Sequence, residues 1–318
     1  MNNEITKISI IAPCYNEEDV IDLFINTITS QMDKLNNKKY DYELICVDDG
    51  SKDKTLSIIK QTAASNNKIK WISFSRNFGK ESAMLAGLQA ADGECAIIMD
   101  ADLQHPPELI PKMVTEYEKG YDQVIAKRSR KGESKRSIFF AHMYYKLVNN
   151  AVDVKIEDGA GDFRLLSRKA IEAMIRLQET NRFSKGLFSW IGFKRTTIDY
   201  ENRERQSGTS KWSFKSLVKY GIDGIVSFNT QPLRVCITLG IALLIISILY
   251  LVFLLINIIM SGIVVPGYFT TIVLICMFGA IQLISLGIIG EYVGRIYSEV
   301  KRRPAFFVEE SNIKNKQL

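Results

Sequence analysis

The chain has 318 residues, of which 47% are hydrophobic and 24% are charged, and its formal net charge is +6. This length accommodates one large domain or two small ones, and the apolar content is ample for a buried core. The positive charge is not gathered into a basic stripe with interleaved aromatic residues, which argues against a nucleic-acid-binding protein. The cysteines lack zinc-binding spacing, so we expect reduced core thiols at Cys14, Cys46, Cys95, Cys236 and Cys276.

Residues 5 to 126 alternate short runs rich in β-branched residues with longer helical patterns. The predicted strands are Lys7–Ala12, Tyr42–Val47, Ile69–Phe74, Cys95–Met99 and Gln123–Ala126. The predicted helices are Glu17–Leu35, Lys54–Ser65, Lys80–Ala91 and Pro107–Lys119. This alternation predicts an α/β fold with a mostly parallel sheet and helices on both faces. Ligands of such sheets bind beyond the carboxyl ends of the strands.

Polar clusters follow the first, second and fourth predicted strands at this edge. They are Pro13–Glu17, Asp48–Ser51 and Asp100–Gln104. Acidic clusters that share one edge repel one another unless they bind cations or hydrogen-bond donors, and a divalent ion or a nucleotide base would serve. No GxGxxG follows the first strand and no P-loop sequence occurs, which argues against a dinucleotide oxidoreductase and a P-loop NTPase.

The third cluster carries the most chemical information. Residues i and i+2 of an extended chain point to the same side, so Asp100 and Asp102 project together. Two carboxylates suit Mg²⁺ or Mn²⁺, because such ions bind through one or two carboxylates and substrate phosphates. Gln104 could add a further oxygen. The alternative is a simple helix start, but the position after a hydrophobic strand, beside other polar strand ends, favours a metal site.

An apolar block begins at Val235 and contains no Asp, Glu, Lys or Arg as far as Gly290. The block is too long for one crossing of a hydrocarbon core of about 30 Å and suits two. Gly and Pro between residues 261 and 267 predict a break, with spans at about Leu233–Met260 and Tyr268–Gly290. A buried helical hairpin in a soluble core is the alternative, which so long an uncharged stretch disfavours.

Basic residues flank the apolar block on both sides, and the connecting loop has none. They are Lys211, Lys215, Lys219 and Arg234 before it, and Arg295, Lys301, Arg302 and Arg303 after it. By the positive-inside rule we expect a multi-pass protein of the cell (plasma) membrane whose N-terminal domain and both termini are cytoplasmic. Met1–Lys7 shows no signal-peptide pattern, which agrees. Two segments have the pattern of interfacial helices or of ordinary amphipathic core helices: Ser137–Val152 and Ser213–Phe228.

The chain resembles the family 2 polyprenyl-phosphate glycosyltransferases of the GT-A fold, which include bactoprenol glucosyltransferases and dolichol-phosphate mannose synthase. The resemblance spans essentially the whole chain. It rests on PCYNE (13–17), VDDGS (47–51), SRNFGKESAMLAG (75–87), MDADLQHPPE (99–108), GAGDFRLLSRKA (159–170), RQSGTSKW (205–212) and GEYVGRIYSEVKRRP (290–304). Processive members carry Gln-x-x-Arg-Trp where this chain reads RQSGTSKW, which favours a single transfer.

The resemblance implies roles for particular residues. The implied nucleotide-sugar site comprises Pro13, Tyr15, Glu17, Asp48, Asp49, Asp100, Asp102 and Lys211. The implied metal ligands are Asp100, Asp102 and Gln104, and the implied acceptor-phosphate contacts are Arg128, Arg164, Arg205, Ser210 and Lys211. The implied catalytic residues are Asp102, Asp162 and Arg205. The alternatives are a solvated face for the arginines, a helix cap for Asp162 and a plain helix start for the polar turn from Arg76 to Glu81.

The implied reaction is inverting transfer of one sugar from a nucleotide-sugar to polyprenyl (undecaprenyl) phosphate at the cytosolic membrane face. UDP-glucose is the expected donor and Mg²⁺ or Mn²⁺ the expected cofactor, with a homo-oligomer, a tetramer, as the expected assembly. GDP-mannose, a UDP-N-acetylhexosamine, another acceptor and a non-catalytic scaffold are the alternatives. The predicted domains are a glycosyltransferase domain (1–212), a juxtamembrane amphipathic helix (213–232), two spans (233–290) and a basic tail (291–318).

Overall fold

The computed structural model describes residues 6–35, 39–129, 159–201, 231–261 and 267–313. It divides into two compact units, one formed by Met1–Gly224 with Arg303–Leu318 and the other by Ile225–Arg302. The predicted interfacial segments, 137–152 and 213–228, lie outside the described residues.

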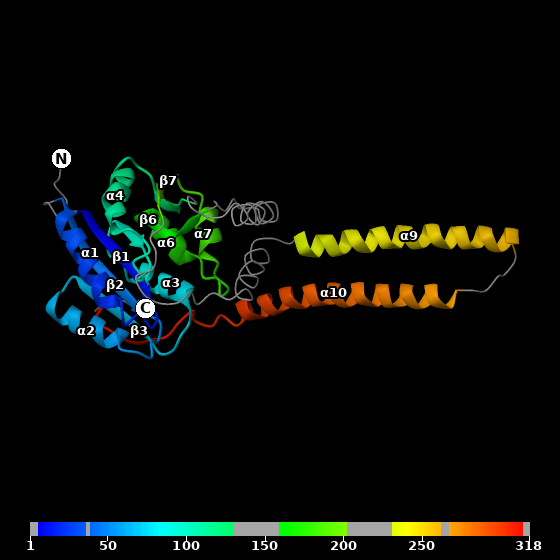
Figure 1. Ribbon diagram of the computed structural model, residues 1–318, viewed down its shortest axis with the longest axis horizontal. Coiled ribbons are helices and arrows are strands. Elements are labelled where there is room, and N and C mark those ends of the chain that lie inside the picture. Colours follow the sequence, from blue (N-terminus) through cyan, green and yellow to red (C-terminus); the bar gives the residue numbers. More distant parts are fainter. Residues whose placement is uncertain (1–5, 36–38, 130–158, 202–230, 262–266, 314–318) are drawn as a thin grey trace. The chain divides into compact units, whose positions relative to one another are not determined.

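The first unit is built on an eight-stranded sheet with the order β7-β5-β6-β4-β1-β2-β3-β8 (Figure 1). The strands are β1 (Thr6–Cys14), β2 (Tyr40–Asp48), β3 (Ile69–Phe74), β4 (Cys95–Ile98), β5 (Gln123–Arg128), β6 (Ala160–Ser167), β7 (Arg195–Tyr200) and β8 (Val308–Ser311). The pairs β1–β2, β1–β4, β2–β3 and β5–β7 are parallel. Strand β6 runs antiparallel between β4 and β5, and β8 runs antiparallel to β3. The predicted α/β fold with a mostly parallel sheet is confirmed.

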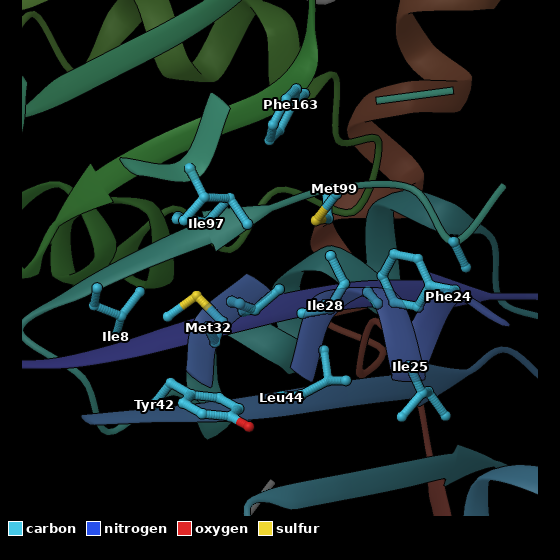
Figure 2. Close-up of a cluster of buried hydrophobic side chains, with 14 of the residues drawn as sticks. Ile8, Phe24, Ile25, Ile28, Met32, Tyr42, Leu44, Ile97, Met99 and Phe163 are labelled. Carbon is cyan, nitrogen blue, oxygen red and sulfur yellow. The ribbon is translucent and has the colours of Figure 1, made fainter. Parts of the chain in front are cut away.

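Helices cover both faces of this sheet. They are α1 (Ile21–Leu35), α2 (Thr55–Ser65), α3 (Lys80–Ala90), the 3-10 turn η1 (Pro107–Leu109), α4 (Ile110–Glu118), α6 (Arg168–Arg176) and α7 (Ser184–Trp190). On one face, Ile8 of β1 shares a fully buried cluster with Phe24 and Ile28 of α1 (Figure 2). Burying one such side chain stabilises the fold by about 1.5–3 kcal/mol.

On the other face, α3 lies directly against β1. A Cβ atom at Gly87 would lie 2.2 Å from Cγ2 of Ile11, so this close approach requires glycine. Successive residues of β1 thus pack on opposite helical layers, as the pleat requires. The packing fixes α3, which begins with Lys80, against the central strand of the sheet.

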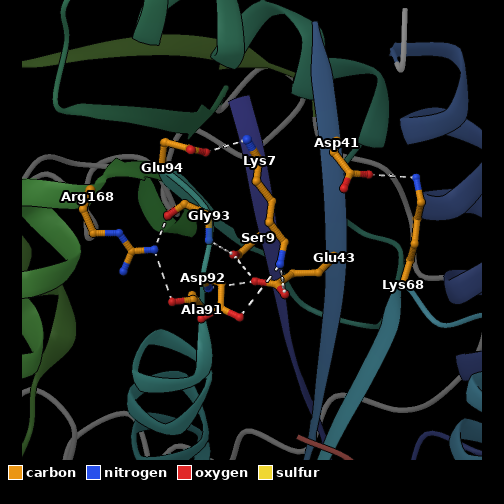
Figure 3. A network of polar contacts seen from close by, with 10 residues as sticks. All are labelled: Lys7, Ser9, Asp41, Glu43, Lys68, Ala91, Asp92, Gly93, Glu94 and Arg168. Carbon is orange, nitrogen blue, oxygen red and sulfur yellow. Dashed lines mark hydrogen bonds and ion pairs between the residues drawn. The ribbon is translucent and has the colours of Figure 1, made fainter. Parts of the chain in front are cut away.

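The amino half of the central strands holds a buried polar network (Figure 3). Glu43 of β2 is 2% exposed, and it accepts hydrogen bonds from Ser9 Oγ at 2.6 Å and from the amide of Asp92 at 2.8 Å. Lys7 forms an ion pair with the same carboxylate at 2.7 Å. The amide of Gly93 donates to Ser9 Oγ at 2.9 Å. A buried charge of this kind is tolerated because it is paired and hydrogen-bonded.

The second unit contains two long helices, α9 (Gln231–Ser261) and α10 (Tyr268–Val300), which lie side by side (Figure 1). Large apolar side chains are exposed on both, as at Leu249 (64%) and Leu283 (73%). Within the described residues, Met277–Val300 is long and apolar enough to cross a membrane, and Thr238–Tyr250 is a shorter apolar stretch. The two predicted spans stay predictions. Helix α10 continues beyond Gly290, where the second span was expected to end.

The predicted basic tail, residues 291–318, is divided between a helix and a strand of the structure. Residues up to Val300 belong to α10, and Val308–Ser311 form β8 at an edge of the sheet. The short β8 sequence lacked a strand signal of its own, because its pairing depends on the distant strand β3.

Candidate functional site

Two loops at the carboxyl ends of β1 and β2 are tied together by hydrogen bonds. The amide of Asn16 donates to Ser51 Oγ at 2.9 Å, and the amide of Lys52 donates to Asn16 Oδ1 at 2.9 Å. Asn16 has a φ of 52°, a left-handed conformation that asparagine adopts more readily than most residues. Tyr15 and Glu17 are half-buried in the first of these loops, as is Pro13 at the end of β1. The structure therefore brings the first two predicted clusters together.

Asp48 and Asp49 are 1% and 3% exposed, and their carboxylate oxygens accept hydrogen bonds from other groups of the protein. Ser73 Oγ donates to Asp48 at 2.9 Å, and the amides of Phe78 and Gly79 donate to Asp49 at 2.6 and 2.9 Å. Burial raises the pKa of Asp49 to about 6, although the two amides oppose the rise. Both aspartates thus organise the loop around the site, and their contact with a nucleotide base stays a prediction.

Asp100 and Asp102 are partly exposed in the loop after β4. The amide of Asp100 donates to His105 Nδ1 at 3.1 Å, and the amide of Gln104 donates to Asp102 Oδ1 at 3.1 Å. Leu103 between the pair and Gln104 has a φ of 57°. A non-glycine residue in this conformation stores backbone strain, which is frequent at functional sites. The backbone of this loop is therefore strained at Leu103, next to the carboxylates of Asp100 and Asp102.

The donor set fits a hard divalent cation. Asp100 and Asp102 supply carboxylate oxygens of the kind that Mg²⁺ and Mn²⁺ bind. Across the part of the chain that the structure describes, no three His, Cys, Asp or Glu side chains are grouped to hold a metal ion. A cation at the two aspartates would therefore complete its coordination with the Gln104 oxygen, water or substrate phosphate.

Asp162 of β6 lies beside this loop because of the antiparallel pairing of β4 with β6. Ile98 pairs with Arg164, so the same register carried two residues further brings Asp100 opposite Asp162. Lys80 Nζ lies 2.6 Å from Asp100 Oδ1 and 2.7 Å from Asp162 Oδ2. One ammonium group therefore joins two carboxylates from two strands.

Asp162 is ionised at neutral pH. Burial favours a higher pKa for Asp162, but Lys80, Lys185 and Arg164 outweigh it and hold the pKa below its usual range. Burial likewise opposes the charge on Lys80, and Asp100 and Asp162 raise its pKa above the ordinary value. The side chains of Asp162 and Lys80 are 15% and 40% exposed, so these charges border solvent.

Arg164 is a buried side chain of β6. It is 3% exposed, its guanidinium lies 3.8 Å over the ring of Phe188, and it donates to the backbone oxygen of Gly161 at 2.6 Å. Residues i and i+2 share a strand face, so Arg164 lies on the side of β6 that carries Asp162. Its burial favours a positioning role over the predicted phosphate contact.

Arg128 and Tyr200 lie at the paired ends of β5 and β7. Arg128 is exposed. Burial raises the pKa of Tyr200, Arg128 lowers it, and the charges of Asp100 and Asp102 raise it further. The ring of Tyr200 lies 6.4 Å from that of His105 in the acidic loop, and Arg128 is paired with Tyr200, so the exposed guanidinium belongs to a strand end beside this loop. Its contact with acceptor phosphate stays a prediction. The remaining predicted residues, Arg205, Ser210 and Lys211, lie outside the described residues.

Glu81, which follows Lys80, is a site residue that the sequence singled out only as part of a polar turn. It accepts a hydrogen bond from the amide of Ser184 at 3.1 Å and another from Ser184 Oγ. Burial and the charge of Asp162 raise the pKa of Glu81 to about 6. Consecutive residues of one helix start therefore connect the acidic loop, β6 and α7.

Residues 9–175 match the family described as Glycosyl transferase family 2, and residues 231–296 match the GtrB C-terminal hairpin. The chain is 53% identical to CsbB of Bacillus subtilis (strain 168) over 311 residues, covering 98% of this chain and 94% of the relative. It is 41% identical to the SfII prophage-derived bactoprenol glucosyl transferase of Shigella flexneri over 309 residues, covering 96% and 98%.

Among solved structures, mannosyl-3-phosphoglycerate synthase from Rubrobacter xylanophilus aligns with a TM-score of 0.46 and 18% identity, over 69% of this chain and 71% of that chain. The family matches confirm the resemblance drawn from the sequence motifs and the glycosyltransferase activity that it implied.

Proposed function

The chain belongs to glycosyl transferase family 2, and from that premise we propose that it transfers one sugar from a nucleotide-sugar to polyprenyl (undecaprenyl) phosphate. The observation that carries this proposal is the cluster of Lys80, Asp100 and Asp162 beside Asp102, beyond the carboxyl end of β4. Accessible carboxylates that are paired with a lysine ammonium group at the ligand-binding edge of the sheet are typical of a catalytic site rather than of a scaffold.

The acceptor is proposed from the second unit and from the relatives. Helices α9 and α10 expose large apolar side chains along their lengths, and Met277–Val300 has the length and composition of a membrane span. A hairpin of this kind would keep the enzyme in the plane where a polyprenyl lipid is confined. Relatives described as bactoprenol glucosyl transferases support the same acceptor and a glucosyl donor, for which UDP-glucose is our proposal.

Asp100, Asp102 and Gln104 would hold Mg²⁺ or Mn²⁺ at the donor diphosphate. When bound, such an ion supplies positive charge that stabilises the departing nucleoside diphosphate. Lys80, which bridges Asp100 and Asp162, brings a second positive charge to the same place. Arg205, Ser210 and Lys211, which lie outside the described residues, are proposed to contact the phosphates.

The chemistry proposed for the protein is mainly positioning. A phosphomonoester carries a charge of about −1.5 to −2 near neutral pH, so the acceptor needs little deprotonation. An acceptor phosphate oxygen forms a bond to the anomeric carbon while the bond from that carbon to the donor diphosphate breaks, which inverts the configuration. Ionised Asp162 would orient the sugar or the acceptor, and well-oriented reactants can gain up to about 7–11 kcal/mol of barrier lowering.

The proposed topology follows the basic flanks of the hairpin. The first unit and both termini would lie in the cytoplasm, with α9 and α10 as the two spans of a plasma-membrane protein. The proposed domain limits are those predicted from the sequence, except that the second helix extends to Val300 and the last residues rejoin the sheet. A homo-oligomer is proposed from the resemblance alone.

The test uses the full chain in liposomes that contain undecaprenyl phosphate, supplied with a panel of UDP- and GDP-sugars. Mass spectrometry of the lipid should show the addition of a single hexose with UDP-glucose. Asp102→Ala should abolish the product, whereas Asp22→Asn, a change at an exposed carboxylate of α1, should not. A non-catalytic scaffold would give no glycolipid with any donor, and a different donor sugar would appear as a different mass increment.

A further inference from the structure

We propose that residues 305–312, here called the C-terminal strap, position the active site by clamping the loop Ser75–Gly79. The strap belongs to the first compact unit, although it follows α10 in the chain. The loop it contacts leads directly into Lys80, whose ammonium joins Asp100 and Asp162. The kinetic part of this inference rests on the proposed function, and the structural part stands without it.

The outer end of the strap is fixed to the edge of the sheet. In β8, Ser311 pairs with Ile72 in antiparallel register. Beyond β8, the Asn312 side chain accepts a hydrogen bond from the amide of Trp71 at 2.8 Å and donates to the backbone oxygen of Ile69 at 3.1 Å. Asn312 therefore continues the ladder with its side chain and anchors the strap to β3.

The inner end of the strap covers the loop itself. Phe306 is 9% exposed and stacks on Phe74, with ring centroids 4.8 Å apart and planes at 15°. The amide of Ser75 donates to the backbone oxygen of Phe307 at 3.1 Å. Ser82 Oγ in the first turn of α3 lies 3.1 Å from the backbone oxygen of Ala305, to which it donates. The strap thus touches the end of β3, the loop and the start of α3.

The opposite side of the same loop is held by the residues after β2. Asp49 accepts the amides of Phe78 and Gly79, and a Cβ at Gly50 would lie 2.5 Å from the carbonyl carbon of Arg76. Gly79 has a φ of 96°, which favours glycine, so the turn before Lys80 is sharply defined. The loop is therefore clamped between the Asp49–Gly50 turn and the strap.

Clamping from two sides matters because catalysis depends on small displacements. Releasing the strap would leave β3 as an unpaired edge and expose Phe74, while the contacts of Asp49 would remain. The Ser75–Gly79 loop that leads into Lys80 would then be held from one side only, and misplacement of a charged group by about 1 Å can cost up to about 100-fold in rate. We expect losses of about 3- to 30-fold for partial release, the range in which contacts remote from a ligand modulate it.

The test compares strap variants of the full chain in detergent micelles. Asn312→Ala removes the anchor, Phe306→Ala removes the stacked ring, and Phe306→Leu keeps most of its apolar volume. Glu309→Gln changes an exposed residue of the same strand and serves as the control. Hydrogen exchange of the peptide that contains residues 75–80 reports the clamp, and kcat and KM for the donor report its consequence.

Asn312→Ala and Phe306→Ala should raise exchange in residues 75–80 and lower kcat/KM, with unchanged exchange in the distant strand β5. Phe306→Leu should recover much of both, and Glu309→Gln should match the wild type. Unchanged exchange and kinetics in Asn312→Ala would overturn the proposal, even if Phe306→Ala fails to fold. If the wild type transfers no sugar, the exchange data still decide the clamp, and only the proposed function fails.

Discussion

Two clusters of charged side chains belong to the same sheet, one at the amino half of β1 and β2 and the other beyond the carboxyl end of β4, and they differ in how their charges are satisfied. At the amino half, Glu43 is 2% exposed, accepts hydrogen bonds from Ser9 and the Asp92 amide, and forms an ion pair with Lys7. At the carboxyl ends, the side chains of Asp100 and Lys80 are 30% and 40% exposed. The first cluster is closed by the protein, whereas the second borders solvent.

This difference shows why charge alone does not identify a site. A buried and saturated carboxylate such as Glu43 contributes to the fold and has no oxygen facing a ligand. Accessible carboxylates next to a cation keep coordination capacity for a substrate or an ion. Substitutions in the first cluster should therefore change stability, and substitutions in the second should change catalysis.

The largest effect is expected at Asp102. Asp102→Ala should lower the rate of sugar transfer by about 1,000-fold or more, because a lost metal ligand removes transition-state charge stabilisation. Thermal unfolding of the solubilised chain should barely change, since Asp102 is partly exposed. Initial rates in liposomes measure the first quantity, and intrinsic fluorescence on heating measures the second. An Asp102→Ala variant that transfers sugar at the wild-type rate would contradict the catalytic role of the exposed cluster.

The next effect is expected at Asp162. Asp162→Asn keeps the size of the side chain but removes one of the two charges that Lys80 joins. We expect kcat to fall about 100-fold, equivalent to about 2.7 kcal/mol, while KM for the donor changes little. A rise in KM alone, with kcat intact, would move Asp162 from an orienting role to donor binding.

Substitution of Glu43 tests the structural role of the buried cluster. Glu43→Ala leaves Ser9 and the Asp92 amide without their acceptor and should lower the free energy of unfolding by about 3 kcal/mol. Glu43→Gln can still accept from Ser9 and should cost less. The transfer rate per folded molecule should stay at the wild-type value in both variants. A loss of kcat in a fully folded Glu43→Gln chain would contradict the structural role.

The smallest effect is a pH dependence at Asp49. Its folded-state pKa, about 6, lies above the ordinary value, so the folded protein binds this proton more tightly than the unfolded chain does. Stability from this group is therefore present below pH 4 and is lost as pH rises to 6, by about 2 kcal/mol. The difference in unfolding free energy between wild type and Asp49→Asn should fall by this amount between pH 4 and 7. A pH-independent difference would mean that Asp49 titrates normally.

The sequence predicted the central α/β architecture because its signals are local. The predicted strand Ile69–Phe74 has the bounds of β3, and the predicted strands before and after it in the chain agree with β2 and β4 within a few residues. Strands β6, β7 and β8 were not predicted, because each pairs with a strand that is remote in the chain. Local periodicity carries little information on such pairings.

The candidate site was predicted in part for the same reason. Asp100 and Asp102 follow a hydrophobic strand, which is a local signal, whereas the approach of Asp162 depends on the register of β4 with β6. The bridge through Lys80 could not be derived from spacing, since it needs the packing of α3 on β1. For Arg164 the resemblance implied a contact with acceptor phosphate, which stays a prediction, and the burial of its side chain became visible only in the structure.

Binding of Mn²⁺ to the full chain in the presence of UDP, measured by electron paramagnetic resonance, tests the central claim most directly. Mn²⁺ should bind to the wild type and to Glu43→Gln with the same affinity, and Asp102→Ala should lose that bound signal. Equal binding by wild type and Asp102→Ala, or loss of binding in folded Glu43→Gln alone, would contradict the assignment of the open cluster as the active site.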